Sequence, residues 1–194
     1  NKANVKRAQQ NKVSEVSNKE VPQQNIAVMQ NAKPVQQISD NQISPFADEV
    51  VRLAGRLKKT HSDKHKNSIS YKSMQLSITD FVSKVGEVKT AKDLKDAINS
   101  LNACADDYLR DHANDKQRIF NTCGKARRER IKTCARIKTM KELFDQGIPY
   151  DSPAGKKRML ACKLVCAEQL AKGFEGFREL CAPNAIQHAV ATKM

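Results

Sequence analysis

The clearest chemical feature of this sequence is positive charge along one predicted helix. The stretch CGKARRERIKTCARIK, residues 123–138, is dense in lysine and arginine and contains one acid, Glu129. On a helical wheel of about 100° per residue, its cations include one continuous stripe: Lys125, Arg128, Lys132 and Arg136. Exposed helix faces usually place acids four residues from such cations, and only Glu129 is available here. The stripe is therefore a candidate phosphate-binding face, and the alternative is an ordinary solvated helix surface.

Arg130 differs from these cations because it falls near the centre of the apolar side of the same predicted helix. A buried charge without a partner is very costly. We therefore expect Arg130 to form a structural ion pair with an acid of the preceding helix and not to belong to the binding surface. The candidate acids are Asp106, Asp107 and Asp111.

A second basic cluster, GKKR, begins another predicted helix. Its cations are Lys156, Lys157 and Arg158. Backbone N–H groups at the start of a helix favour anions, and adjacent cations add to that preference. These residues are a second candidate for phosphate binding, and the alternative is a connector with solvated charge. The sequence leaves open whether the two clusters share one side of the molecule.

Signatures of catalysis are weak. His61 and His65 flank Asp63 at a spacing that can hold a transition metal on a helix, but the segment resembles a loop and offers no third ligand. Cys162 and Cys166 are one helical turn apart, whereas zinc ribbons use C-x2-C knuckles in loops. The phosphate-binding loop, nucleophile-elbow, zinc-protease and dinucleotide motifs are absent from the sequence. We therefore expect no enzyme activity, no catalytic residue, no metal and no cofactor.

Composition narrows the class of partner. The chain has 194 residues and a formal net charge of +14, which favours nucleic acid, an acidic membrane surface or an acidic protein. Tryptophan is absent and aromatic residues are few, so base-stacking platforms are poorly supplied. No apolar run is long enough to span a bilayer. Because no signal peptide is visible and the chain does not begin with Met, we expect a segment or processed product of a larger protein.

The six cysteines bear on the compartment. Most fall at helical positions beside Leu, Ile and Phe, where a free thiol behaves as a small apolar group. Reduced, buried thiols are therefore favoured over three disulfides, which is typical of a soluble protein in a reducing, cytoplasmic compartment. The compartment otherwise stays open. The cysteines are Cys104, Cys123, Cys134, Cys162, Cys166 and Cys181.

The hydrophobic pattern predicts an all-α bundle of about five helices, residues 44–194, after a Gln/Asn-rich N-terminal extension or linker, residues 1–43. The first helix is expected to begin with Ser44 as its cap and Pro45 in its first turn. The others are expected at Ser70–Val85, from Thr90 with a capping box, at Lys116–Gln146, and from Ser152 to before Pro183.

These features predict a non-enzymatic binding or assembly module whose basic helix face engages an anionic partner. Nucleic acid is the first expectation, bound through its phosphates without sequence specificity and with strong salt dependence. One alternative is an acidic membrane surface of the phosphoinositide type, contacted by electrostatics alone because the stripe carries no Trp, Phe or Leu. Another is a protein–protein module in which the N-terminal extension docks on a partner and the charge serves solubility.

Overall fold

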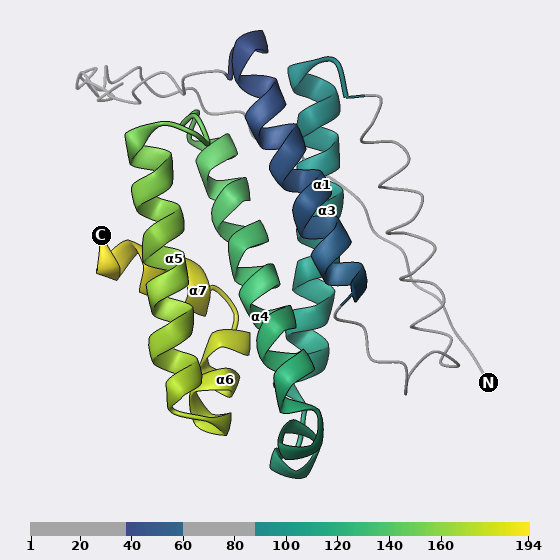
Figure 1. Cartoon of the computed structure of the whole chain (residues 1–194), viewed down its shortest axis with the longest axis vertical. Coiled ribbons are helices and arrows are strands. Elements are labelled where there is room, and N and C mark those ends of the chain that lie inside the picture. The colour runs from purple at the N-terminus through teal and green to yellow at the C-terminus, as the bar shows by residue number, and fades with distance from the viewer. Residues whose placement is uncertain (1–37, 60–87) are drawn as a thin grey trace, which may run out of the picture. The chain divides into compact units, whose positions relative to one another are not determined.

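A computed structural model describes residues 38–59 and 88–194, and within these ranges the protein is all-α, as predicted (Figure 1). The expected helix at Ser70–Val85 and residues 1–37 of the extension lie outside the described residues. The α-helices are α1 (Ile43–Lys59), α3 (Ala91–Ala113), α4 (Gln117–Asp145), α5 (Pro153–Ala171), α6 (Phe174–Cys181) and α7 (Ala185–Lys193), with a 3-10 turn, η1 (Asp40–Gln42), before α1.

The beginning of α1 differs from the prediction. Ser39 caps η1 instead of Ser44 capping α1, and its N–H donates to Gln42 Oε1 at 3.1 Å. The helical turn then continues without interruption into α1 at Ile43. Ile38 is buried in the core, so the packed region begins a few residues before Ser44.

The third predicted helix is confirmed in detail. The Asp93 N–H donates to Thr90 Oγ1 and the Thr90 N–H donates to Asp93 Oδ2, both at 3.1 Å, which closes the capping box at the start of α3. One face of α3 then packs on the core along most of the helix. Its buried residues include Leu94, Ile98, Leu101, Ala105, Tyr108 and His112.

The last predicted helix, from Ser152 to before Pro183, is two shorter helices, α5 and α6, and a further helix, α7, follows Pro183. Gly173 takes a φ of +77°, a left-handed conformation that favours glycine, and it separates α5 from α6. Asn184, at φ +58°, begins α7 after the turn at Pro183. Gly176 permits the close return of α6, because a Cβ there would stand 1.7 Å from the Gln169 carbonyl oxygen.

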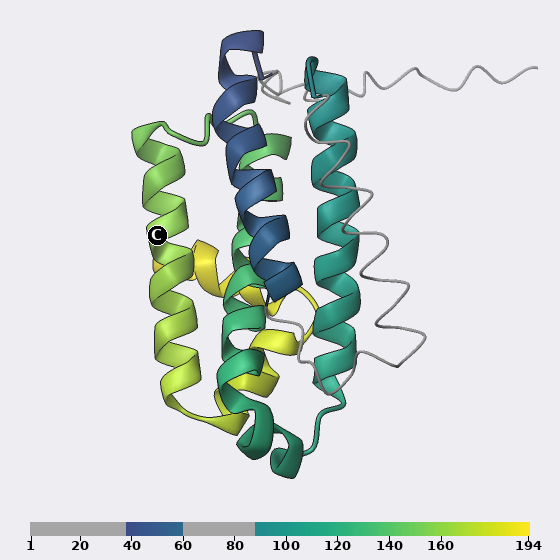
Figure 2. The same ribbon diagram turned by 45° about the vertical axis from the view of Figure 1, so that its right-hand side comes forward.

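Helix α4 is the centre of the described part and packs against each of its other α-helices. Figure 1 shows α5 on one side of α4 and α1 on the other, and Figure 2 shows α3 beside α1. Phe46 of α1 meets Phe144 edge-to-face with ring centroids 5.6 Å apart. Phe120 meets Phe177 of α6 at 4.9 Å, so aromatic contacts hold α4 near both ends.

Candidate anion-binding surface

The predicted stripe on α4 exists, but folding engages most of it. Lys125 is exposed and makes no ion pair with the described residues. Arg128 lies over the Phe120 ring, with Cζ 5.0 Å from the centroid. Lys132 Nζ contacts the Glu129 carboxylate at 2.8 Å on an exposed part of the helix. Arg136 Nη2 lies 3.3 Å from a carboxylate of α1. The stripe is therefore not a row of four cations that all lack partners.

Glu49 is the carboxylate of α1 that engages Arg136, and it is only 6% exposed. It also accepts hydrogen bonds from both Nε and Nη2 of Arg52, one helical turn away. These hydrogen bonds raise the pKa of Arg52. One acid thus holds two guanidinium groups and links α1 to α4, leaving this position with an excess of one positive charge.

A groove of about 280 Å³ lies beside this ion pair and is lined by residues of α1, α4 and α5. Arg56 enters from α1 and Lys163 from α5, and both are exposed. Lys132 and Arg136 enter from α4, together with a single carboxylate, Glu129. Four cations therefore surround a hollow that contains one acid. We call this set, Arg56, Lys132, Arg136 and Lys163, the groove cations.

The remaining wall of the groove is formed by α5 and includes two thiols. Cys162 and Cys166 are both buried and free, as are Cys134 and Cys181. A hydrogen bond between the two groove thiols lowers the pKa of Cys162, and the charge of Arg136 lowers it further. The same hydrogen bond, together with burial, raises the pKa of Cys166. The inner wall thus consists of small buried side chains, whereas three of the groove cations, Arg56, Lys132 and Lys163, are exposed.

The second basic cluster lies at the other end of the α4–α5 hairpin. Ser152 caps α5 by accepting from the Gly155 N–H at 3.1 Å. Lys156 and Lys157 are exposed in the first turns. Arg158 is already engaged, because Nη1 donates to Gln146 Oε1 at 2.7 Å. Since α4 and α5 are joined by a short connector and lie side by side, this cluster is remote from Lys125, which is about 30 Å away along α4.

Helix α5 connects the second cluster to the groove along its exposed side. Lys156 and Lys163 are seven residues apart and therefore lie on one line of the helix, about 10 Å from each other. Leu160 and Leu164 are exposed between and beside them, at 55% and 43%. This face of α5 thus combines cations with two solvent-facing leucines.

Arg130 is buried, at 2% exposure, as the sequence predicted. Its described contacts come from α3: Nη1 lies 3.1 Å from His112 Nε2, and Cζ lies 5.0 Å from the centroid of the Tyr108 ring. Two of the candidate acids have other partners, since Asp106 contacts Lys138 and Asp107 contacts Arg110. The pairing of Arg130 with Asp106, Asp107 or Asp111 thus stays a prediction, while its burial keeps it off the surface.

Asp115 organises the polar cluster around Arg130. Its carboxylate lies 3.2 Å from His112 Nδ1 and 2.8 Å from Arg127 Nε. Burial opposes ionisation of Asp115, but the His112 hydrogen bond and the Arg127 charge outweigh it and lower its pKa. Burial lowers the pKa of His112, so the neutral ring can donate from Nδ1 to Asp115 and accept from Arg130 at Nε2.

The sequence analysis missed Arg56 and Lys163. They lie on two other helices, and only the packing of α1 and α5 against α4 brings them to the groove. Neither His61 nor His65 lies in the described residues. In the part of the chain that the structure describes, no group of three or more His, Cys, Asp or Glu residues is placed to hold a metal. No helix there is long and apolar enough to cross a membrane.

The fold and the groove define an all-α bundle with a cationic surface between three helices. Comparisons with protein families, with curated proteins and with solved structures found no match for this chain.

Proposed function

We propose that this protein is a non-enzymatic binding or assembly module that engages a polyanion, with nucleic-acid phosphates as the partner. The observation that carries the proposal is the convergence of the four groove cations around a hollow with one carboxylate. Converging positive charge at a concave surface raises the local concentration of anions. Exposed Lys125 extends the charge along α4, and Lys156 and Lys157 extend it along α5.

The mode of binding follows from the residue types. Guanidinium and ammonium groups contact phosphate oxygens, which position a nucleic acid without reporting its sequence. None of the described residues that line the groove is aromatic, so recognition through base stacking has no support from them. Binding is therefore expected to depend on backbone charge and to weaken steeply with salt.

The test is a salt titration with a fluorescently labelled random single-stranded oligonucleotide, read by fluorescence anisotropy. Lys132→Gln combined with Lys163→Gln removes two groove cations that are exposed in the fold. Each lost phosphate contact reduces the slope of log K against log salt by about 0.7. The double variant should therefore lose about 1.4 in slope, or roughly 25-fold in affinity at 0.1 M salt.

A matched control removes the same charge elsewhere. Lys92→Gln combined with Lys95→Gln changes two exposed lysines of α3 that lie outside the groove. Its slope should remain close to that of the parent protein. Equal losses in the two double variants would mean that net charge alone drives binding, and undiminished binding in the groove variant would remove the groove from the proposal.

The acidic-membrane alternative has one observation in its favour. Leu160 and Leu164 are exposed on α5 among Lys156, Lys157 and Lys163. An amphipathic face with cations and leucines is typical of helices that lie in a membrane interface. Sedimentation with vesicles containing phosphatidylserine tests it. Leu160→Gln with Leu164→Gln should reduce vesicle binding and leave oligonucleotide binding unchanged if this alternative holds.

A further inference from the structure

A second, larger cavity lies on a different side of α4. It has a volume of about 390 Å³ and is formed by α3, α4 and the turn that joins α6 to α7. This volume is within the range of about 300–1,000 Å³ that is typical of small-molecule sites. Its lining residues are Asp106, Leu109, Arg110, Ala113, Lys138, Cys181, Ala182, Pro183, Asn184, Ile186 and Gln187.

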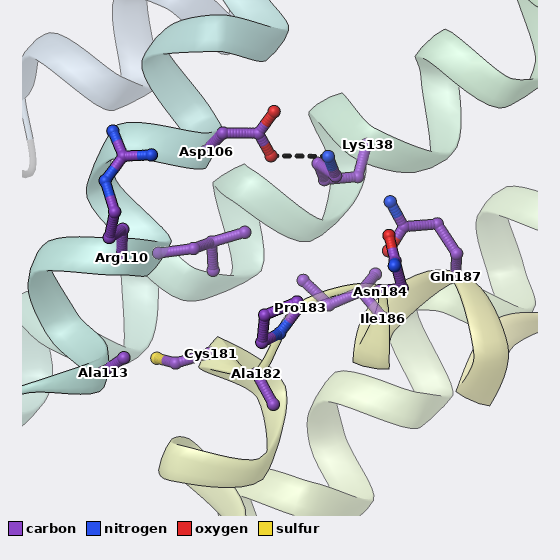
Figure 3. A pocket seen from close by; sticks show the side chains of 11 residues that line it. Asp106, Arg110, Ala113, Lys138, Cys181, Ala182, Pro183, Asn184, Ile186 and Gln187 are labelled. Carbon is purple, nitrogen blue, oxygen red and sulfur yellow. Dashed lines mark hydrogen bonds and ion pairs between the residues drawn. The ribbon is translucent and has the colours of Figure 1, made fainter.

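The cavity combines an apolar wall with polar groups at its edge. Leu109, Ala113 and Ile186 supply hydrocarbon surface from α3 and α7. Cys181 adds a buried thiol, whose pKa burial raises to about 12, so it is un-ionised at neutral pH. Figure 3 shows the Asp106–Lys138 pair on one side of the cavity and the residues of the α7 start on another. An apolar body with one polar end fits such a lining.

Each of the two cations at the edge of the cavity is paired with an acid, Lys138 with Asp106 and Arg110 with Asp107. Asp106 uses both carboxylate oxygens within the fold, one for Lys138 and one for the Asn102 side-chain amide at 3.1 Å. The Lys138 ammonium retains further donors after this contact. Arg110 stands at the rim and pairs with Asp107, which does not line the cavity. Both oxygens of Asp106, the acid in the lining, thus already accept a hydrogen bond within the fold.

Two side-chain amides complete the edge. Asn184 begins α7 but does not cap it, and neither Asn184 nor Gln187 forms a side-chain hydrogen bond with the described residues. Both amides therefore remain able to donate to an oxygen of a ligand. The groups that can donate to a ligand here are therefore these two amides and the donors that the Lys138 ammonium retains.

We propose that this cavity binds a small amphiphilic anion, a carboxylate on a short apolar chain. The carboxylate lies against the Lys138 ammonium with the Asn184 and Gln187 amides beside it, and the chain lies against Leu109, Ala113 and Ile186. This site is separate from the groove, because Lys138 is about 120° or more around α4 from Lys132 and Arg136.

Octanoate and its neutral analogue octanamide are the probes, with binding to the full chain measured by isothermal titration calorimetry. Octanoate should bind saturably, and octanamide should bind at least about tenfold more weakly, since a charge-assisted hydrogen bond is lost. Lys138→Met should weaken octanoate binding by a similar factor. Lys141→Met is the matched control, because it removes a comparable pair with Asp145 on the same helix but outside the cavity.

A second pair of variants tests the location through volume. Ala113→Phe fills the cavity from α3 and should abolish octanoate binding, whereas Ala103→Phe adds the same ring to an exposed position of α3 outside it. If circular dichroism shows that Ala113→Phe is unfolded, Gln187→Phe fills the cavity from α7 instead. The proposal is overturned if octanoate gives no saturable heat, if octanamide binds equally well, or if binding survives both Lys138→Met and a folded cavity-filling variant.

Discussion

Removing the charge of Glu49 should change the stability of the fold and its affinity for an oligonucleotide in opposite directions. The buried Glu49 carboxylate holds Arg52 and Arg136, and Arg136 is one of the groove cations. The substitution Glu49→Gln keeps the size of the side chain and removes its charge. We expect it to destabilise the fold and, at the same time, to strengthen the binding of an oligonucleotide.

The magnitudes follow from exposure. Removing one partner of a fully buried ion pair costs about 3–5 kcal/mol. The side chains of Arg52 and Arg136 remain 38% and 31% exposed, so solvent screens the charges that are left and the cost should be about 1–3 kcal/mol. A loss of 2 kcal/mol lowers the melting temperature by roughly 4–8 °C for a chain of this size. Release of Arg136 should add one phosphate contact, or about fivefold in affinity at 0.1 M salt.

The assay pairs urea unfolding with oligonucleotide anisotropy on the same samples. Asp48→Asn is the control, because Asp48 is the neighbouring exposed acid on α1 and the substitution changes net charge by the same amount. It should leave stability unchanged and should strengthen binding less than Glu49→Gln does. If Glu49→Gln binds no more tightly than Asp48→Asn, then Arg136 does not contact the polyanion and the groove is wrongly assigned.

Two further predictions concern the fold. Burial lowers the pKa of His112 below 6.5, its value in an unfolded chain, so the unfolded state takes up a proton first as the pH falls. The stability that is present above pH 6.5 is therefore lost below pH 6.5, by up to about 1.4 kcal/mol per pH unit. Urea unfolding between pH 7.5 and 5.5 should show that the free energy of unfolding depends less on pH in His112→Gln than in the parent protein. The control His188→Gln, which changes an exposed ring, should keep the pH dependence of the parent protein. An unchanged pH dependence in His112→Gln would assign the proton to another group. Gly155→Ala should destabilise by about 1–3 kcal/mol or more, because the new Cβ would stand 2.3 Å from the Pro149 carbonyl oxygen. Gly55→Ala, in open space within α1, should instead stabilise by about 0.5–1 kcal/mol, and thermal melting of the two variants distinguishes these signs.

The fold could be predicted where local signals agree with packing. In α3, the capping box and the hydrophobic pattern both depend on residues a few positions apart, and the structure has both the box and a buried apolar face there. The single long helix expected after Ser152 was wrong because the apolar period continues through Gly173. There the φ of +77° and the return of the chain onto α5 interrupt the helix. Such a return depends on contacts between helices, and a helical wheel does not contain them.

The candidate site shows the same limit. The stripe on α4 could be read from spacing, and so could the burial of Arg130. The acid that engages Arg136 could not, because Glu49 lies 87 residues earlier on α1. Arg56 and Lys163 were missed as well, since nothing in the spacing of residues on α1 and α5 shows that these side chains lie beside α4. Periodicity identifies the face of a helix, whereas the partners on that face depend on tertiary packing.

Two groups of cations in the described residues differ in what folding does to their charge. Those that link helices have carboxylates at short range: Arg136 with Glu49, Lys138 with Asp106, and Arg127 with Asp115. A different group is exposed and makes no ion pair with described residues: Arg56, Lys125, Lys156, Lys157 and Lys163. Exposed cations without partners contribute little to stability. Their positive charge therefore remains available to a polyanion, and substitutions among them can test binding with the fold intact.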